Sequence, residues 1–324
     1  DQFNAIKDKI VRDYKNFSLS DAHQQTRDKG DGIFNHVKYS WKESLPVAEA
    51  ATLSDIEEYG KYLYKKTFVE GLVYGDFKKR DARRALRLFK EKTKTRGIRR
   101  EHAFDIKYLD QLQTEKIQYV GKLAVNNSCF YREYVLGEDS PEIRATSMVI
   151  SQALQQPFFT EMRTNQQLGY IVWSYARNRD ETHYLSFVIQ SGAFTADDVN
   201  QRAADFIAST PEFLASMDGE TFNQLKKSAI EQLEKKPMSI RERANKLKTF
   251  IFEHNADFQR DDKTIAALKK LDQTSAVDLL ANTVSKDTRR MVNCLMFAEH
   301  HDNPTGVKSS FDDVNTWKAS RSYK

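Results

Sequence analysis

The chain has 324 residues and a net charge of +5, with 40% hydrophobic and 11% aromatic residues. At roughly 100–200 residues per domain this length predicts two domains, and the apolar content excludes general disorder. No apolar run approaches the roughly 18 residues that a bilayer-spanning helix needs, so we expect no membrane span.

The first residues, Asp1–Asn4, include no methionine and no apolar signal core. We therefore expect this sequence to begin inside a longer one, from which any targeting segment is already absent. What remains is compatible with a periplasmic and with a cytosolic protein.

A weak internal repeat organises the chain. Two patterns recur at offsets of 219 and 218 residues: Phe3-Asn4-x-x-Lys7 as Phe222-Asn223-x-x-Lys226, and Phe34-x-His36 as Phe252-x-His254. Each copy is expected to contain a long helix, a break, two further helices and an apolar strand. The two strands are predicted at Val69–Gly75 and at Met291–Phe297.

The segment from Lys78 to Arg100 is strongly basic, with twelve Lys or Arg residues against two acids. Its apolar residues follow one helical stripe, which predicts a surface helix that runs into a linker. The basic residues form either a solvated helix face or a surface for a polyanion or acidic partner. No aromatic residues are interleaved for base stacking, so we predict no nucleic-acid partner.

About one hundred residues precede the second copy and have no counterpart before the first. Their pattern predicts two strands and a helix, and then the same order again. The strands are expected at 116–125, 129–136, 168–177 and 182–191, and the helices at 141–163 and 195–206. Ser140 before Pro141 and Thr195 before Asp198 provide helix caps. We therefore predict the C-terminal part of one domain at 1–105 and a complete domain of the same type at 106–324.

These elements favour an α+β fold, because the strands come in hairpin blocks and do not alternate strictly with helices. The predicted sheet is mixed or largely antiparallel, with helices covering one face. Cys129 and Cys294 each lie in an apolar strand, where two buried thiols are expected and a disulfide is not.

A zinc-hydrolase site is not encoded in these residues. None of the seven histidines stands in H-E-x-x-H or in its inverted form H-x-x-E-H. The one local cluster, Glu299-His300-His301, places adjacent histidines on a predicted strand, whose side chains would point to opposite faces. The chain also lacks G-x-S-x-G and the glycine-rich phosphate loops, so we expect no bound metal and no self-sufficient active site.

The most informative segment is Phe158–Ser174, which reads FFTEMRTNQQLGYIVWS. It contains the pattern F-x-x-x-R-x-x-x-Q-L-G-Y-x-V, formed by Phe159, Arg163, Gln167, Leu168, Gly169, Tyr170 and Val172. Gly169 is expected to serve the backbone, at a junction where a positive φ is needed. The pattern resembles the last domain of the pitrilysin family, which includes insulin-degrading enzyme and bacterial protease III.

The resemblance implies LuxS/MPP-like metallopeptidase domains, here the C-terminal part of a third domain and a complete fourth. Family members consist of two halves that close around a chamber. The first half holds zinc, so Zn²⁺ and a peptide substrate are implied for the full-length enzyme, and this chain alone is expected to be inactive. At matching positions the resemblance implies that Arg163 and Tyr170 are catalytic residues that hydrogen-bond the substrate beside the zinc. Phe159 is expected to bind substrate with them.

Fixed donors of this kind suit peptide hydrolysis, since negative charge builds on the scissile carbonyl oxygen. Donors supplied by the second half would act only after the two halves close. Two alternatives remain: a non-catalytic scaffold or peptide-binding subunit of the same fold, and a binding module that acts through residues 78–100.

Overall fold

The computed structural model describes residues 2–111 and 114–324, and the chain divides into two compact units. The sheet unit comprises Asn16–Ser40, Lys107–Lys235 and Arg260–Lys324. The helical unit comprises Asp1–Lys15, Trp41–Ile106 and Lys236–Gln259. Each unit is described by itself below.

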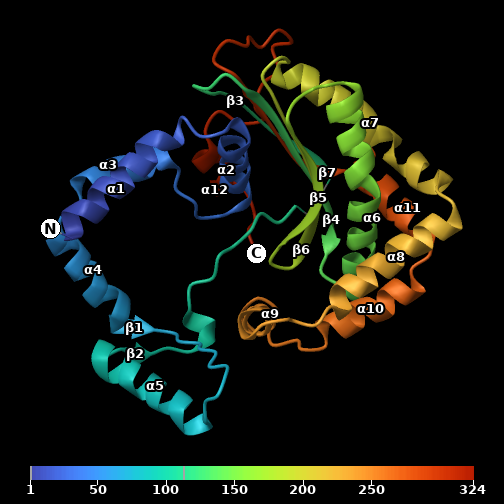
Figure 1. The fold of residues 1–324 in the computed structure, drawn as a ribbon. Helices are drawn as coiled ribbons and strands as arrows, with labels where there is room; N and C mark the ends of the chain where they lie inside the picture. Colours follow the sequence, from blue (N-terminus) through green and yellow to red (C-terminus); the bar gives the residue numbers. More distant parts are fainter. Residues whose placement is uncertain (1, 112–113) are drawn as a thin grey trace. The chain divides into compact units, whose positions relative to one another are not determined.

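A five-stranded sheet forms the centre of the sheet unit (Figure 1). Its strands are β3 (Glu115–Lys122), β4 (Ser128–Glu138), β5 (Ile171–Arg179), β6 (Thr182–Ser191) and β7 (Arg290–Phe297), in the order β3-β7-β4-β6-β5. β3 pairs with β7 in parallel, and the other neighbours are antiparallel. The predicted α+β class and mixed sheet are confirmed.

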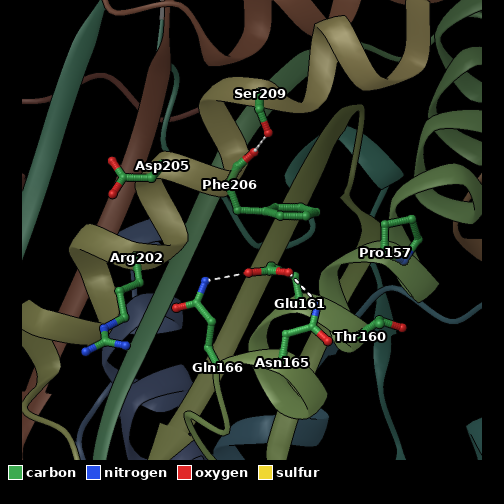
Figure 2. Close-up of a pocket in the computed structure, with 9 residues that line it drawn as sticks. All are labelled: Pro157, Thr160, Glu161, Asn165, Gln166, Arg202, Asp205, Phe206 and Ser209. Carbon is green, nitrogen blue, oxygen red and sulfur yellow. Dashed lines mark hydrogen bonds between the residues drawn. The ribbon is translucent and has the colours of Figure 1, made fainter. Parts of the chain in front are cut away.

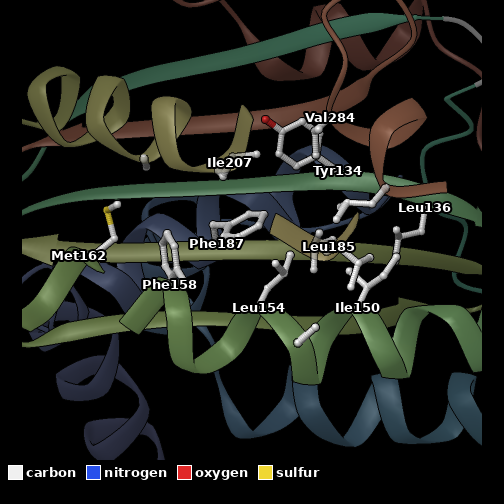
Figure 3. Packing of buried hydrophobic residues seen from close by; sticks show 14 of the residues in the cluster. Tyr134, Leu136, Ile150, Leu154, Phe158, Met162, Leu185, Phe187, Ile207 and Val284 are labelled. Carbon is white, nitrogen blue, oxygen red and sulfur yellow. The ribbon is translucent and has the colours of Figure 1, made fainter. Parts of the chain in front are cut away.

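The main helical layer of this unit covers one face of the sheet. It consists of α6 (Pro141–Phe159), α7 (Ala196–Ser216), α8 (Gly219–Glu234), α10 (Arg260–Lys270) and α11 (Gln273–Val284). The predicted caps are present, since Ser140 accepts a hydrogen bond from the Ile143 amide and Thr195 accepts one from the Asp198 amide. Figure 3 shows Phe158 and Leu154 of α6 directed at Phe187 and Leu185 of the sheet. Burial of this apolar face supplies the main stabilisation of the unit.

The opposite face carries a second apolar cluster, which α2 (Ala22–Phe34) and α12 (Val314–Ala319) cover. Ile33 and Phe34 of α2 are fully buried there. They pack on strand residues whose side chains alternate along each strand with those of the first core. Cys129 and Cys294 lie in this cluster as free, buried thiols, as predicted, and burial raises the pKa of Cys129 to about 12. The second face is therefore closed by a helix from the first copy of the repeat.

The helical unit contains most of α1 (Gln2–Phe17) together with α3, α4, α5, α9, the short 3-10 helix η1 and a two-stranded parallel ladder. Their bounds are Trp41–Ala50, Leu53–Lys65, Lys79–Thr93, Ile240–Phe252 and Arg100–His102 for the helices, and Lys66–Thr67 (β1) and Arg96–Gly97 (β2) for the strands. The predicted basic helix is present as α5. Among the described residues, α1, α3, α4 and α5 bury no side chain.

The internal repeat is visible in matching contacts. The Lys7 ammonium donates to the Ala51 carbonyl at 2.8 Å, and Lys226 donates to Leu271 at 2.6 Å. Thr52 caps α4 as Asp272 caps α11. Between them, α2 and α9 occupy the same place in the two copies, yet α2 belongs to the sheet unit and α9 to the helical unit.

The strand predicted at Val69–Gly75 is wrong. Only Lys66 and Thr67 pair, with Arg96 and Gly97, and residues 69–75 are irregular. An apolar, β-branched run forms a strand only where a neighbouring strand satisfies its backbone groups. No sheet within the described ranges offers that neighbour to residues 69–75.

Candidate functional site

The segment Phe158–Ser174 connects the end of α6 to the edge strand β5. The helix predicted for 141–163 is α-helical to Phe159 and continues as a π-helical turn, Thr160–Asn165. Such turns are rare and occur frequently at functional sites. The backbone amide of Gln166 donates to the Glu161 carbonyl, and that of Leu168 donates to Met162, both at 2.9 Å.

Three apolar side chains anchor this turn in the first core. Phe158, Met162 and Leu168 are all essentially inaccessible to solvent. They alternate with the partly or fully exposed Phe159, Arg163 and Tyr170. The segment therefore presents one set of side chains outward from a rigid base.

Gly169 is required by packing, which corrects the expected need for a positive φ. The left-handed residue is Gln167, with φ of +52°, whereas Gly169 is outside that region. A Cβ atom at Gly169 would lie 1.8 Å from the Gln190 carbonyl oxygen of β6. The chain therefore passes directly over the β6 backbone before it enters β5.

The three predicted site residues come together at the exposed side of the turn. The Arg163 guanidinium carbon lies 4.9 Å from the ring centre of Phe159 and 4.7 Å from that of Tyr170. Cation–π attraction holds a guanidinium in this range. The two aromatic rings thus fix a side chain that would otherwise rotate freely.

The polar ends of this group are unpaired. Tyr170 is 77% exposed. Within the described ranges, neither the Arg163 guanidinium nor the Tyr170 hydroxyl forms a hydrogen bond or ion pair with another residue. The arrangement offers several N–H donors and one hydroxyl to an external acceptor.

The N-terminus of α2 supports the same edge of the sheet from the other side. The His23 backbone amide donates to Gln190 Oε1 at 2.9 Å, and the His23 ring lies edge-on to Trp173 of β5 at 5.2 Å. The residue beneath Gly169 is therefore held by a helix that lies more than one hundred residues earlier in the chain.

No metal centre accompanies this group. Across residues 2–111 and 114–324, no three His, Cys, Asp or Glu side chains gather in a way that could hold an ion. His300 and His301 follow β7 in a turn, with ring centres 4.2 Å apart, which corrects the expectation that a strand separates them. His301 Nδ1 is 2.8 Å from Ser128 Oγ. Nor does any helix in the described part combine the length and apolarity of a membrane span.

A family model and several known proteins are similar to this chain. Residues 149–248 match the family model described as PQQ synthase PqqF-like, C-terminal lobe domain 4. The A-factor-processing enzyme of Saccharomyces cerevisiae is 24% identical, over 89% of this chain and 28% of its own length. The insulin-degrading enzyme of Drosophila melanogaster is 22% identical, over 93% of this chain and 31% of its own.

Among solved structures, pitrilysin superposes over 100% of this chain and 35% of its own with a TM-score of 0.83 at 19% identity. Together these matches support a C-terminal half of the M16 peptidase type, similar to pitrilysin and insulin-degrading enzyme. An inactive domain of an M16 peptidase from Pseudomonas fluorescens also shares the fold, with a TM-score of 0.63 at 15% identity over 91% of this chain and 70% of its own.

The chain corresponds to the C-terminal half of such a peptidase. It spans less than one third of the length of the A-factor-processing enzyme and of the Drosophila insulin-degrading enzyme. The family assignment predicted from the Phe158–Ser174 pattern is confirmed.

Sequence reasoning overlooked the polar residues that close the turn. Asn165 Nδ2 and Gln166 Nε2 donate to the two carboxylate oxygens of Glu161, at 2.7 and 2.8 Å. These two hydrogen bonds, Gln166 first, lower the pKa of Glu161. An acid four residues before an amide on a helix was the available indication.

Proposed function

We propose that this chain is the substrate-gripping half of a zinc metalloendopeptidase and that Arg163 and Tyr170 hydrogen-bond the substrate peptide. The observation that carries the proposal is the stacked, unpaired donor group at the start of β5. The family relationship supports peptide hydrolysis as the reaction.

The proposed role of the pair is to bind and orient a backbone carbonyl. A guanidinium edge and a phenol hydroxyl donate to one or two carbonyl oxygens, and the rings of Phe159 and Tyr170 keep the guanidinium in place before substrate arrives. Donors fixed in advance lose little freedom on binding, so more of the hydrogen-bond free energy is realised. Phe159 acts through Arg163 as a positioning residue.

Zinc does not fit the residues of this chain, because the described part has no suitable ligand cluster. We place the ion in the N-terminal half, on the same polypeptide or on a partner chain. The contribution of residues 1–324 is limited to substrate binding and closure.

We also propose that residues 1–105 are the C-terminal part of a third family-type domain and 106–324 the fourth. The exposed apolar residues of the helical unit support this reading. Ile56 of α4 is 53% exposed, whereas the corresponding Ala276 of α11 is fully buried on the sheet. A sheet outside residues 1–324 would bury the α4 face in the same way.

The test uses the complete enzyme, with its zinc half present. Arg163→Ala and Tyr170→Phe should each lower kcat/KM for a peptide by about 10²–10³ with zinc content unchanged. Arg163→Lys is the matched control that keeps the charge but not the planar donor fork, and it should recover only part of the loss. Full activity in both Arg163→Ala and Tyr170→Phe would contradict the proposed role of the pair in substrate binding.

A non-catalytic peptide-binding subunit is the second candidate, favoured by the inactive M16 domain of similar fold. It predicts peptide binding by the complete protein without cleavage. Zinc analysis and a peptide-cleavage assay on that protein distinguish the two.

A polyanion surface on α5 is a separate proposal, supported by the exposure of its basic residues from Lys79 onward. Heparin binding that weakens steeply with salt is its expected signature.

A further inference from the structure

A pocket of about 580 Å³ is lined in part by the π-helical turn. Its walls come from the turn and from α7 (Figure 2). The lining includes Glu161, Gln166, Asp205 and Phe206. No residue of the Arg163 group lines it, so the pocket is distinct from the proposed grip.

The turn side of the pocket is rich in hydrogen-bond acceptors. Figure 2 shows the Glu161 carboxylate between the amides of Asn165 and Gln166 and facing the Phe206 ring. Each carboxylate oxygen receives one amide hydrogen bond, which leaves further lone pairs available. The carbonyl oxygens of both amides accept nothing from the described residues.

The charge of the pocket is also uncompensated. Asp205 receives a hydrogen bond from Gln201 at 2.9 Å, and neither Asp205 nor Glu161 forms an ion pair within the described ranges. The one cationic lining residue, Arg202, is already engaged by Asp198 at 3.1 Å and stacks on Phe194. Two carboxylates, Glu161 and Asp205, therefore line the pocket without forming an ion pair within the described ranges.

Phe206 supplies an aromatic wall beside these acceptors. Its ring packs edge-on against the buried Phe158 at 5.4 Å, which fixes its position. An aromatic face next to carboxylates and amide carbonyls is the environment that organic cations prefer. The ring face attracts the positive charge, and the oxygen atoms accept hydrogen bonds from its N–H groups.

We propose that this pocket binds an organic cation, a guanidinium or primary ammonium group. The group would come either from a basic side chain of a peptide or from a free polyamine. The proposal stands apart from the Arg163–Tyr170 grip. Because Glu161 also holds Asn165 and Gln166, an occupied pocket would further order the turn that carries Arg163.

The experiment is calorimetric titration of the complete protein with N-acetyl-arginine amide, with neutral N-acetyl-norleucine amide as the matched control ligand. Saturable binding of the arginine ligand alone is expected, and it should weaken as salt is raised. Glu161→Gln and Asp205→Asn should each weaken it about tenfold. Glu212→Gln, an exposed acid on α7 outside the lining, should leave it unchanged.

Glu161→Gln also alters the turn, so Asp205→Asn on α7 is the decisive variant. Equal binding of the neutral ligand, absence of saturable binding, or wild-type affinity in Asp205→Asn would each overturn the proposal. A parallel titration with spermidine separates the two sources. Tighter binding of the arginine ligand assigns the pocket to peptide side chains, and tighter binding of spermidine assigns it to polyamines.

Discussion

The guanidinium of Arg163 stacks 4.7 Å from the ring centre of Tyr170, seven residues further along the chain. The π-helical turn and the crossing of Gly169 over β6 bring the two side chains together. The ring centre of Phe159, one helical turn earlier, lies 4.9 Å from the same guanidinium.

The first prediction concerns this second ring. Phe159→Leu keeps an apolar side chain but removes the cation–π contact, so Arg163 gains rotational freedom. We expect kcat/KM of the complete enzyme to fall about fivefold, which corresponds to the roughly 1 kcal/mol of one such contact. Steady-state kinetics on a peptide substrate measures the change. An unchanged kcat/KM would mean that Phe159 does not position Arg163.

A second prediction concerns the crossing of the turn over β6. Gly169→Ala places a Cβ atom 1.8 Å from a backbone oxygen that cannot move alone, so the free energy of unfolding should fall by about 3 kcal/mol. Urea denaturation measures the change. Gly60→Ala, in α4 with no neighbouring atom within 4 Å, is the matched control. It should raise stability slightly, since alanine favours helix.

A third prediction uses the repeat as its own control. Phe34 of α2 is fully buried on the sheet, whereas the corresponding Phe252 of α9 is partly exposed. Phe34→Ala should lower the free energy of unfolding of the sheet unit by about 3–5 kcal/mol. Phe252→Ala should cost less than about 1 kcal/mol in this chain. Equal losses would contradict the different placement of the two helices.

A fourth prediction concerns pH. Asp139 accepts hydrogen bonds from Arg144 at 2.6 Å, from both terminal nitrogens of Arg260 at 2.7 Å and from His183 at 2.7 Å. Burial alone would raise the pKa of Asp139, but the hydrogen bonds from Arg260 and His183 lower it well below its usual 3.8. Burial also lowers the pKa of His183 below 6.5.

The lowered pKa values of Asp139 and His183 change the stability in the same direction. As the pH falls, the unfolded chain takes up protons before the folded chain does, so stability decreases. The His183 contribution is lost below about pH 6.5 and that of Asp139 below about pH 4. Asp139→Asn should lower stability at pH 7 by about 2–4 kcal/mol and flatten the acid limb below pH 4. Denaturation curves across pH check this, with Glu212→Gln as a control that leaves the profile unchanged.

The sequence predicted the elements of the sheet unit well. The strand at 182–191 has its predicted bounds, and Met291–Phe297 lies within β7. Alternation and capping are local properties that identify a strand even where its partners are distant, as for β7, which pairs with β3 and β4. The family resemblance named Arg163, Tyr170 and Phe159 as site residues, but the stacking of Arg163 on the two rings is visible only in the structure.

The features of the fold and of the site that could not be predicted depend on contacts that no local sequence pattern encodes. The run at Val69–Gly75 has the composition of a strand but no partner within the described residues. The amphipathic pattern of α2 does not say which core it will join. The sequence suggests that Gly169 is a turn residue. The structure shows that glycine is needed there because the Gln190 carbonyl oxygen, twenty-one residues away, leaves no room for a Cβ atom. The pocket beside Glu161 arises only when α7 packs against the turn.

The assignment of α2 to the sheet unit limits where the chain can be divided. A cut after residue 105 would remove Ile33 and Phe34 from the second apolar cluster. The sheet residues that α2 covers would then be exposed to water, so residues 106–324 need residues 16–40 for a closed core.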